Sequence, residues 1–339
     1  MPLRYGSSPS RAPMRGVPQL PAAGVDWILR DTHDAAAGRK ALAAGLLAVP
    51  ASIEPRYLYD RVGCALFCAI CELPEYYPTR TEAAIFERHR ASIAAAAGTG
   101  KQLVDLGAGD CRKAAAWMPW LRPYRYVAVD IAEPALAAAL AQLAVEEPSL
   151  EITGVVTDFA RGLDLARELA GGPATFFYPG SSIGNFTPDD AGRFLRSIRR
   201  HCQAREGGGL LIGVDTPKDP QRLRAAYADA AGVTAAFNRN VLNHVNRLLG
   251  TRFAPDAFDH VAIYDEDRGR VEMHLQARSA QTVEIEGIAR RFEAGARIHT
   301  ENAYKYAPRE FTAMLDRAGF AHVRCWQDDA GDFVVYYAS

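Results

Sequence analysis

The sequence predicts an α/β fold in which a parallel sheet is covered by helices on both of its faces. Short apolar runs, typical of buried strands, lie at residues 102–106, 125–130, 151–156, 174–179 and 209–214. Stretches with the three-to-four-residue spacing of helices separate them, at residues 111–118, 133–146, 161–169 and 188–204. Strands that alternate with helices form a parallel sheet, because each helix carries the chain back to the edge where the next strand begins.

A different pattern follows residue 215 and predicts a smaller lobe of α+β type. Helices are expected near residues 219–230 and 233–249, and alternating runs typical of antiparallel strands follow at 259–265, 270–277 and 282–288. The chain then returns to the first pattern, with a helix at 308–318 and strands at 321–327 and 332–338. Upstream of the first strand, apolar spacing predicts helices over residues 24–50 and 63–71, and from Pro78 to the glycines that follow residue 97.

The composition is that of a globular protein with little net charge. Of the 339 residues, 49% are hydrophobic and 23% are charged, and the formal net charge is -1. This balance gives no electrostatic reason to expect a nucleic acid or an anionic membrane as a partner. The sequence shows no secretory signal and no apolar stretch long enough to span a bilayer, so we expect a cytoplasmic protein with reduced cysteines.

The segment Leu-Val-Asp-Leu-Gly-Ala-Gly-Asp, residues 103–110, predicts where a ligand binds. An apolar strand ends in Gly107 and Gly109, and the next apolar run ends in Asp130, a carboxylate that can accept both hydroxyls of a ribose. Arg112 stands where the dinucleotide fingerprint has its third glycine, which a pyrophosphate needs for close approach to the backbone. An adenosine ligand without phosphates, such as S-adenosylmethionine (SAM), therefore fits better than NAD.

Two further strand ends carry polar residues at the same edge of the sheet. Asp158 follows the third strand and can accept the adenine amino group, while Phe159 can stack on the adenine ring. Asn185 lies in the loop after the fourth strand, where its amide can face a methyl acceptor. Each of these side chains also suits a helix cap or a turn, so the sequence alone leaves both roles open.

The ligand site and the two sequence patterns together define the expected domains. The ligand of an open α/β sheet lies at the carboxyl ends of its strands, so the smaller lobe should cover that edge. We expect a SAM-binding domain of residues 80–215 and 305–339 and a substrate-binding lobe of residues 25–79 and 216–304. Residues 1–24 contain no continuous apolar run and are expected to be a disordered extension.

Three closely spaced cysteines, Cys64, Cys68 and Cys71, offer a possible metal site. Their spacing is also that of the iron–sulfur cluster in radical SAM enzymes. Leu66 and Phe67 fall between them at helical spacing, which favours a packed helix without a metal. The eight histidines are scattered and form no His-Glu-x-x-His motif, so we expect no metal ion.

Longer segments that together cover almost the whole chain point to one family. The most specific is Leu-Pro-Glu-Tyr-Tyr-Pro-Thr-Arg-Thr-Glu at residues 73–82; others lie at 57–63, 179–186, 213–219, 226–238, 271–275 and 298–306. These segments resemble the SAM-dependent histidine Nα-methyltransferases of ergothioneine biosynthesis. The resemblance implies a Rossmann-like class I SAM methyltransferase sheet with a second lobe. It also implies a monomeric enzyme that uses SAM to trimethylate the α-amine of L-histidine, which gives hercynine.

The resemblance also assigns roles to individual residues. It implies a substrate pocket formed by Tyr59, Phe67, Tyr76, Asn185, Tyr227, Met273, Glu301 and Ala303. In that pocket Asn185 and Tyr227 hold the substrate carboxylate and Tyr76 contacts the amine, so Tyr76 and Asn185 are the expected catalytic residues. Met273 and Glu301 face the imidazole. The implied cofactor contacts are Tyr76, Gly107, Lys113, Asp130, Asp158 and Phe159.

Ala303 departs from the family pattern, which usually has a serine there that helps to hold the ring nitrogen. The lost hydrogen bond costs roughly 0.5–1.5 kcal/mol, while Glu301 still offers a stronger, charge-assisted contact. The alternative substrates are another aromatic amino acid or a histidine derivative. A SAM-binding protein without turnover is a third hypothesis, but a pure binder needs no acceptor pocket such as Asn185, Tyr227 and Glu301 provide.

Overall fold

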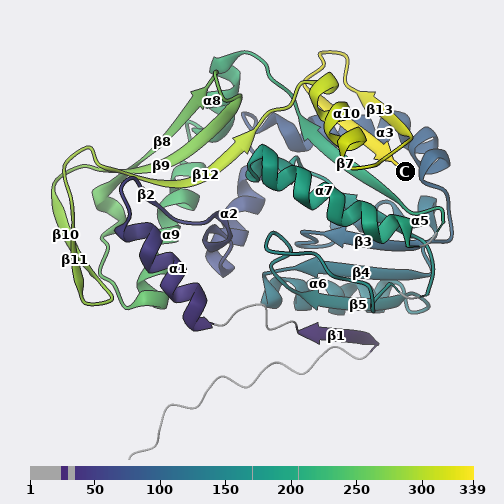
Figure 1. Ribbon diagram of the computed structural model, residues 1–339, viewed down its shortest axis with the longest axis horizontal. Helices are drawn as coiled ribbons and strands as arrows, with labels where there is room; N and C mark the ends of the chain where they lie inside the picture. Colours follow the sequence, from purple (N-terminus) through teal and green to yellow (C-terminus); the bar gives the residue numbers. More distant parts are fainter. Residues whose placement is uncertain (1–23, 30–34, 170, 205) are drawn as a thin grey trace, which may run out of the picture.

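The computed structural model describes residues 24–29, 35–169, 171–204 and 206–339. Figure 1 shows two parts side by side, a large sheet flanked by helices and a smaller part built around a second sheet. The expected disordered extension, residues 1–24, lies outside the described residues except for Gly24.

The large sheet has the strand order β1-β5-β4-β3-β6-β7-β14-β13 within the described residues. Its strands are β1 (Val25–Leu29), β3 (Gln102–Leu106), β4 (Arg125–Asp130), β5 (Glu151–Val156), β6 (Ala174–Tyr178), β7 (Gly209–Asp215), β13 (Val323–Gln327) and β14 (Phe333–Ala338). Neighbouring strands are parallel from β1 to β7, whereas β14 is antiparallel to both β7 and β13. This topology confirms the predicted fold, a Rossmann-like class I methyltransferase sheet.

Helices cover both faces of this sheet. One face carries α7 (Pro188–Gln203) and α10 (Pro308–Arg317); the other carries α3 (Tyr77–Ala97), α4 (Arg112–Ala115), α5 (Met118–Leu121) and α6 (Glu133–Glu146). Successive strand residues point to opposite faces, so Val127 packs in the core under α7 while its neighbours Tyr126 and Ala128 pack in the core under α3. None of the described helices is long and apolar enough to cross a membrane.

The smaller part contains a sheet with the strand order β2-β12-β9-β8 in the described chain. Its strands are β2 (Ala51–Ser52), β8 (Phe258–Asp265), β9 (Arg270–Ala277) and β12 (Arg297–Tyr304), and beside them lies the hairpin of β10 (Gln281–Ile285) and β11 (Ile288–Phe292). Helices α1 (Ala35–Leu47), α2 (Arg61–Cys71), α8 (Pro220–Tyr227) and α9 (Val233–Leu249) complete it, with the short turns η1 (Pro55–Leu58) and η3 (Pro255–Ala257). One hydrophobic core joins residues 42–77 with residues 223–303, so two distant chain segments fold together.

The structure corrects the expectation for the start of the smaller lobe. A helix is expected over residues 24–50, but Val25–Leu29 form β1, which pairs in parallel with β5 in the large sheet. The missing side chain of Gly154 makes room for Trp27 of β1, since a Cβ there would lie 2.6 Å from the Trp27 ring. Residues 25–29 therefore belong to the large sheet and not to the expected substrate-binding lobe.

Other corrections concern places where turns or long-range contacts replace a regular element. The expected helix at 161–169 is not formed by these described residues, because the Leu163 carbonyl accepts a hydrogen bond from Ser197 Oγ of α7 at 3.0 Å. The expected strand at 282–288 is the hairpin β10–β11, whose turn residues Glu286 and Gly287 both have positive φ. The expected helix at 111–118 is divided into α4 and α5.

The two parts meet at the carboxyl ends of the large sheet. The short turn η2 (Ser182–Asn185) follows β6 and contacts β12 of the smaller part. A Cβ at Gly184 would lie 2.7 Å from the carbonyl oxygen of Tyr304, so only glycine allows η2 to approach β12 this closely. The approach brings Asn185, at the end of η2, next to the second half of β12.

Candidate active site

The glycine loop after β3 is held in place by the carboxylate at the end of β4. Gly107 and Gly109 have φ values of 73° and 54°, in the left-handed region that favours glycine. Asp130 accepts hydrogen bonds from the backbone N–H groups of Gly109 through Oδ2 and of Ala132 through Oδ1, both at 2.8 Å. The predicted ribose-binding residue therefore also fixes the shape of the loop.

Phe159 lies against this loop and offers it a flat aromatic surface. A Cβ at Gly107 would lie 3.9 Å from Phe159 Cζ. The Phe159 ring is itself fixed by a stacked contact with Phe194 of α7, with the ring centroids 5.6 Å apart. The bare glycine loop, the aromatic ring and the Asp130 carboxylate suit the adenosine part of SAM, and these residues would hold its adenine and ribose.

Asp158, the predicted partner of the adenine amino group, is paired with an arginine of the smaller part. Its Oδ2 lies 3.4 Å from Arg56 Nη1 and 3.5 Å from Arg161 Nε, while Oδ1 accepts a hydrogen bond from the Ala160 N–H at 3.2 Å. Arg56 lies in η1, just before one of the family-like segments, and its sequence position alone gives no sign of this contact. The contact of Asp158 with adenine stays a prediction.

Lys113, another predicted cofactor contact, is positioned by a buried carboxylate that sequence reasoning missed. Its Nζ lies 2.7 Å from Glu82 Oε2, and the backbone N–H of Gly180 donates to Glu82 Oε1, also at 2.7 Å. Glu82 is only 1% exposed, and a Cβ at Gly213 would collide with it. One carboxylate thus ties the helix after the glycine loop to the loop after β6.

Glu301 is the central polar residue on the substrate side. Its Oε1 accepts hydrogen bonds from Asn185 Nδ2 at 3.2 Å and from the Tyr59 hydroxyl at 3.5 Å. Burial raises the pKa of Glu301 to about 7, against the smaller opposing effects of the Tyr59 hydroxyl and the Lys305 ammonium. The structure therefore brings together three of the predicted substrate residues, which come from η2, β12 and the turn after η1.

Aromatic rings form one wall beside this carboxylate. Tyr59 and Phe67 pack edge to face with centroids 5.7 Å apart, and Tyr76 contacts Phe67 at 6.4 Å and Tyr227 at 6.2 Å. Phe237 of α9 joins the wall, 5.7 Å from Tyr59. It lies inside the family-like segment 226–238, but sequence reasoning gave it no role. The ring contacts of Tyr76 are on the substrate side, so its predicted cofactor contact stays a prediction.

Met273 and Ala303 complete the predicted pocket on the second sheet. Met273 of β9 pairs with Glu301 of β12, and the ladder is irregular between His299 and Glu301. Such a bulge re-aims the side chains that follow it. Ala303 comes two residues after Glu301 and shares its face of the strand, and both Met273 and Ala303 are buried.

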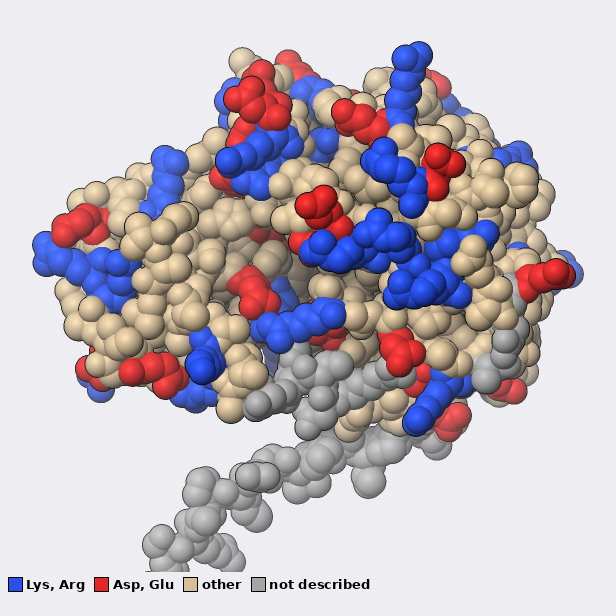
Figure 2. Space-filling view, in the orientation of Figure 1, with Lys and Arg blue, Asp and Glu red and all other residues tan. Residues whose placement is uncertain are grey.

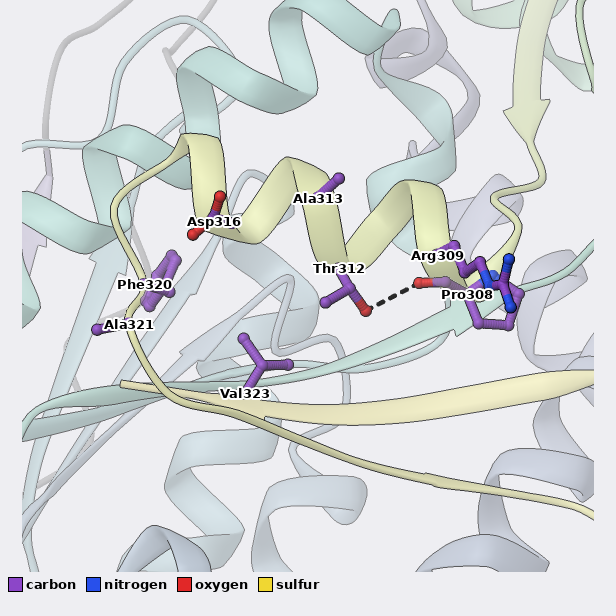
Figure 3. A pocket seen from close by; sticks show the side chains of 8 residues that line it. All are labelled: Pro308, Arg309, Thr312, Ala313, Asp316, Phe320, Ala321 and Val323. Carbon is purple, nitrogen blue, oxygen red and sulfur yellow. Dashed lines mark hydrogen bonds between the residues drawn. The ribbon is translucent and has the colours of Figure 1, made fainter.

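A surface groove lies away from these residues. It has a volume of about 560 Å³ and is lined by α10 and the residues after it, including Thr312, whose hydroxyl donates to the Pro308 carbonyl inside the helix (Figure 3). A second groove of about 430 Å³ includes Thr157 and Phe159 in its lining. The second groove borders the residues that would hold SAM, because Phe159 is one of them. None of the predicted site residues lines the first groove.

The three closely spaced cysteines lie on α2, which confirms the predicted helix. Cys64 and Cys71 are half-buried, and Cys68 is exposed. Burial raises the pKa of the Cys64 thiol to about 11, which disfavours the thiolate form that binds metals. In the part of the chain that the structure describes, no three His, Cys, Asp or Glu side chains come close enough together to hold a metal ion.

Comparison with known proteins gives one consistent family. Residues 38–339 match the family described as histidine-specific methyltransferases, SAM-dependent. The Histidine N-alpha-methyltransferase of Mycolicibacterium smegmatis is 42% identical over 301 residues, which is 87% of this chain and 92% of that protein. The protein of the same name from Mycobacterium tuberculosis is 39% identical over 302 residues, with the same coverage of both chains. Ergothioneine biosynthesis protein 1 of Neurospora crassa is 30% identical over 289 residues, which is 82% of this chain and 32% of that longer protein.

These matches confirm the predicted resemblance, the enzyme class and SAM as the methyl donor. The hypothesis of a SAM-binding protein without turnover is therefore set aside. The glycine loop, the carboxylate at the end of β4 and the pocket around Glu301 are the features of this chain that suit such a reaction. The chain belongs to the family of SAM-dependent, histidine-specific methyltransferases.

Proposed function

We propose that this enzyme transfers three methyl groups in succession from SAM to the α-amine of L-histidine. The product is hercynine, and the reaction is the first step of ergothioneine-type biosynthesis. The observation that carries the proposal is the buried Glu301 carboxylate, held by Tyr59 and Asn185 beside an aromatic wall. A buried carboxylate is costly unless it meets a partner, and an imidazole N–H supplies one of the right polarity.

The imidazole and the carboxylate of a histidine molecule would contact different residues in this pocket. Glu301 would accept a hydrogen bond from the imidazole, with Met273 beside the ring. Tyr227 and Asn185 would donate to the substrate carboxylate. The Asn185 amide has two N–H donors, so its hydrogen bond to Glu301 leaves a second donor for the substrate.

The residues near the amine would act by alignment. When bound, SAM supplies a methyl group on a positively charged sulfur, which is already a good leaving group. The α-amine, with an ordinary pKa of about 8 or above, must be neutral to attack, and a nearby positive charge favours the neutral form. Tyr76 and Asn185 would align its lone pair, and the Tyr76 ring would place aromatic surface near the positive charge that develops.

The alternative substrate remains another aromatic amino acid or a histidine derivative. The observation that favours it is Ala303, which is buried on the Glu301 face of β12 and offers no hydroxyl to the ring. Product analysis decides between the two. The enzyme is incubated with SAM and an equimolar mixture of the amino acids and ring-methylated histidines, and the products are identified by mass spectrometry. Histidine with three added methyl groups supports the proposal, whereas a different methylated amino acid supports the alternative.

Restoring a hydroxyl beside Glu301 tests the pocket directly. We expect Ala303→Ser to lower KM for histidine by about twofold to tenfold, because one added hydrogen bond contributes roughly 0.5–1.5 kcal/mol. The kcat value and KM for SAM should stay the same. Steady-state kinetics on both variants measures this, and an unchanged or higher KM for histidine would mean that Ala303 does not face the ring.

Removing the Tyr76 hydroxyl tests the alignment of the amine. We expect Tyr76→Phe to slow the first two methylations by about tenfold or more and to change histidine binding much less, since alignment acts on the transition state. Single-turnover kinetics with each methylated intermediate separates the steps. Unchanged single-turnover rates would remove Tyr76 from the proposed catalytic residues.

We also propose that the enzyme acts as a cytoplasmic monomer, without a nucleic acid or a membrane as partner. The formal net charge of -1 gives no electrostatic reason for a nucleic acid or an anionic membrane as a partner. Figure 2 shows side chains of both signs on the face that it displays, with a group of positive ones near its middle. Light scattering of the purified protein tests the monomeric state. A mass of two or more chains would contradict it.

A further inference from the structure

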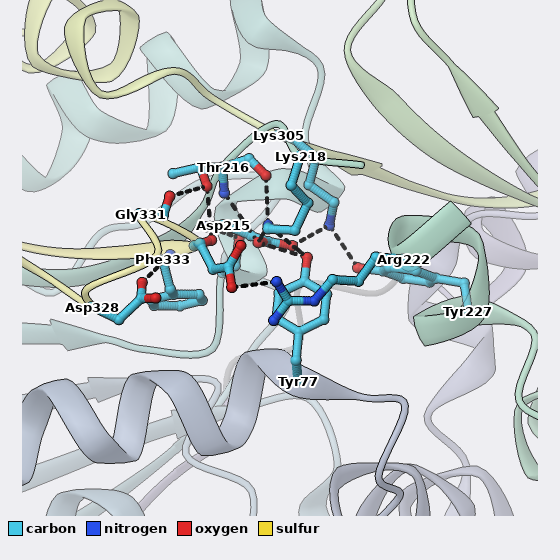
Figure 4. A network of polar contacts seen from close by, with 12 residues as sticks. Tyr77, Asp215, Thr216, Lys218, Arg222, Tyr227, Lys305, Asp328, Gly331 and Phe333 are labelled. Atoms are coloured by element: carbon cyan, nitrogen blue, oxygen red, sulfur yellow. Dashed lines mark hydrogen bonds and ion pairs between the residues drawn. The ribbon is translucent and has the colours of Figure 1, made fainter. Parts of the chain in front are cut away.

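A buried ionic network lies where the two parts of the molecule meet (Figure 4). Its centre is Asp215, at the end of β7, whose carboxylate is completely buried. The Tyr77 hydroxyl donates to Asp215 Oδ2 at 2.7 Å, and Lys305 Nζ lies 2.8 Å from the same oxygen. Lys218 pairs with the other oxygen, Oδ1. Sequence reasoning gave no role to Asp215, Lys218 or Lys305.

The Asp215 carboxylate is paired with more than one cation. Among the described residues, two ammonium groups face it, and the neighbouring Arg222 is paired with Asp332 at 2.5 Å. The Lys305 ammonium also acts on Glu301, whose pKa it lowers against the larger effect of burial. Burial by itself would raise the pKa of Asp215, but the two lysines hold that pKa below its ordinary value. Because a buried cation is costly without partners, a substrate carboxylate near Lys305 would stabilise it further.

The two lysines face different neighbours. Lys218 donates to the Tyr77 hydroxyl at 2.8 Å and to the Thr216 carbonyl at 2.6 Å. Its hydrogen bonds are therefore made to α3 and to the end of the large sheet. Lys305 Nζ donates instead to the hydroxyl of Tyr227 at 2.8 Å, and its side chain is 1% exposed. Tyr227 is the last residue of α8 in the smaller part, and its ring borders the Tyr76 ring.

The hydrogen bond from Lys305 decides what Tyr227 can do. An ammonium group only donates, so the Tyr227 oxygen accepts and its own proton points elsewhere. A hydroxyl that accepts from a cation becomes a stronger donor, because hydrogen bonds in a chain polarise one another. Tyr227, whose ring borders the Tyr76 ring, thus has a polarised O–H that is backed by a buried positive charge.

We propose that Lys305 is a positioning residue that makes a free α-carboxylate a requirement for substrates of this enzyme. It fixes the Tyr227 hydroxyl and directs its proton to the substrate carboxylate, and its own positive charge lies directly behind that hydroxyl. Amines, amino alcohols and esters that lack the carboxylate would lose this charge-assisted contact and bind poorly. The inference rests on the proposed function, in which Tyr227 holds the carboxylate.

The test compares histidine with histidinol, in which a CH₂OH group replaces the carboxylate. Binding of each to the complex with S-adenosylhomocysteine is measured by calorimetry, and methylation by kinetics. We expect Lys305→Met to weaken histidine binding at least about tenfold, the effect of losing a charge-assisted contact, and to leave histidinol binding nearly unchanged. Lys305→Arg, which keeps the charge, should recover part of the preference.

Lys218→Met is the matched control, because it removes an ammonium from the same carboxylate without touching Tyr227. It should keep the preference for histidine over histidinol, although it should lower the melting temperature as Lys305→Met does. Tyr227→Phe keeps the ring and should lose the preference to the same extent as Lys305→Met, with no further loss in the double variant. This variant decides the question if Lys305→Met fails to fold.

Retention of the full preference by a folded Lys305→Met or Tyr227→Phe variant would overturn the inference. An equal loss for histidine and histidinol would also overturn it, since that is the mark of a merely structural role. A wild-type enzyme that methylates a different amino acid would defeat the proposed function instead. The comparison is then made with that amino acid and its alcohol, and the same outcomes decide on Lys305.

Discussion

Replacing Glu301 by glutamine should stabilise the free enzyme above neutral pH. The pKa of Glu301 is raised by burial from 4.5 to about 7, so the folded state binds a proton that the unfolded chain has released. A raised carboxyl pKa destabilises the folded state progressively as the pH rises from the ordinary value to the folded value. At about pH 8 the cost is roughly 3 kcal/mol. Glutamine avoids the cost and can still accept the hydrogen bonds from Tyr59 and Asn185.

Thermal unfolding of Glu301→Gln and wild type across the pH range checks this expectation. The variant should melt several degrees higher at about pH 8, and the difference should narrow towards pH 5, where the wild-type carboxyl is protonated in the folded state. Glu147→Gln, at an exposed position at the end of α6, is the matched control and should follow the wild type. A variant that melts below the wild type at about pH 8 would show that Glu301 is ionised and stabilised in the free enzyme.

The same substitution should weaken histidine binding, because the charge-assisted contact with the imidazole is lost. At about pH 8 we expect the dissociation constant to rise by about tenfold to one-hundredfold, the usual effect of losing a hydrogen bond to a charged group. Calorimetry in the presence of S-adenosylhomocysteine measures it. Stabilisation together with unchanged histidine affinity would mean that the imidazole binds somewhere else.

Replacing Asp130 by alanine should abolish most of the affinity for SAM. Its carboxylate accepts hydrogen bonds from Gly109 and Ala132, which shape the loop, and it would also hold the ribose. Loss of charge-assisted hydrogen bonds worth roughly 3 kcal/mol in total corresponds to a dissociation constant at least about 100-fold higher. Isothermal titration calorimetry with SAM measures the dissociation constant of the variant and of the wild type.

Asp110→Ala is the control for this variant. Asp110 lies next to Gly109 in the same loop, but its carboxylate is partly exposed and pairs with the exposed Arg112. Since exposed ion pairs contribute little, SAM affinity should change by less than about twofold. If the two variants lost affinity equally, the loop as a whole, and not the Asp130 carboxylate, would determine cofactor binding.

The large sheet and its glycine loop could be predicted from the sequence because their signals are local. Apolar runs mark the buried strands, and Gly107 and Asp130 stand at strand ends where topology fixes their place. β1 could not be found in this way. Its residues 25–29 lie close to an alanine-rich helix in the sequence, and their partner β5 is more than a hundred residues away. The sign of that pairing in the sequence is the small Gly154, which leaves room for the Trp27 ring opposite it.

The substrate pocket was predicted from the resemblance, but the residues that support it were missed. Glu82, Asp215 and Lys305 each act through a partner on another element, so no spacing within one helix or strand reveals them. Phe237 was missed for a related reason, because an aromatic residue on an amphipathic helix is usually part of a core. Buried charges become visible only when the folded chain shows which carboxylate faces which lysine.

The measurement that tests the central claim most directly is the site and number of methyl transfers. Histidine labelled with a heavy isotope at its α-nitrogen is incubated with enzyme and SAM that carries a labelled methyl group, and the product is examined by NMR. The proposed function predicts that all three methyl groups couple to the labelled α-nitrogen and that three equivalents of S-adenosylhomocysteine form per histidine. Methyl signals coupled to a ring nitrogen, or no transfer to histidine at all, would contradict it.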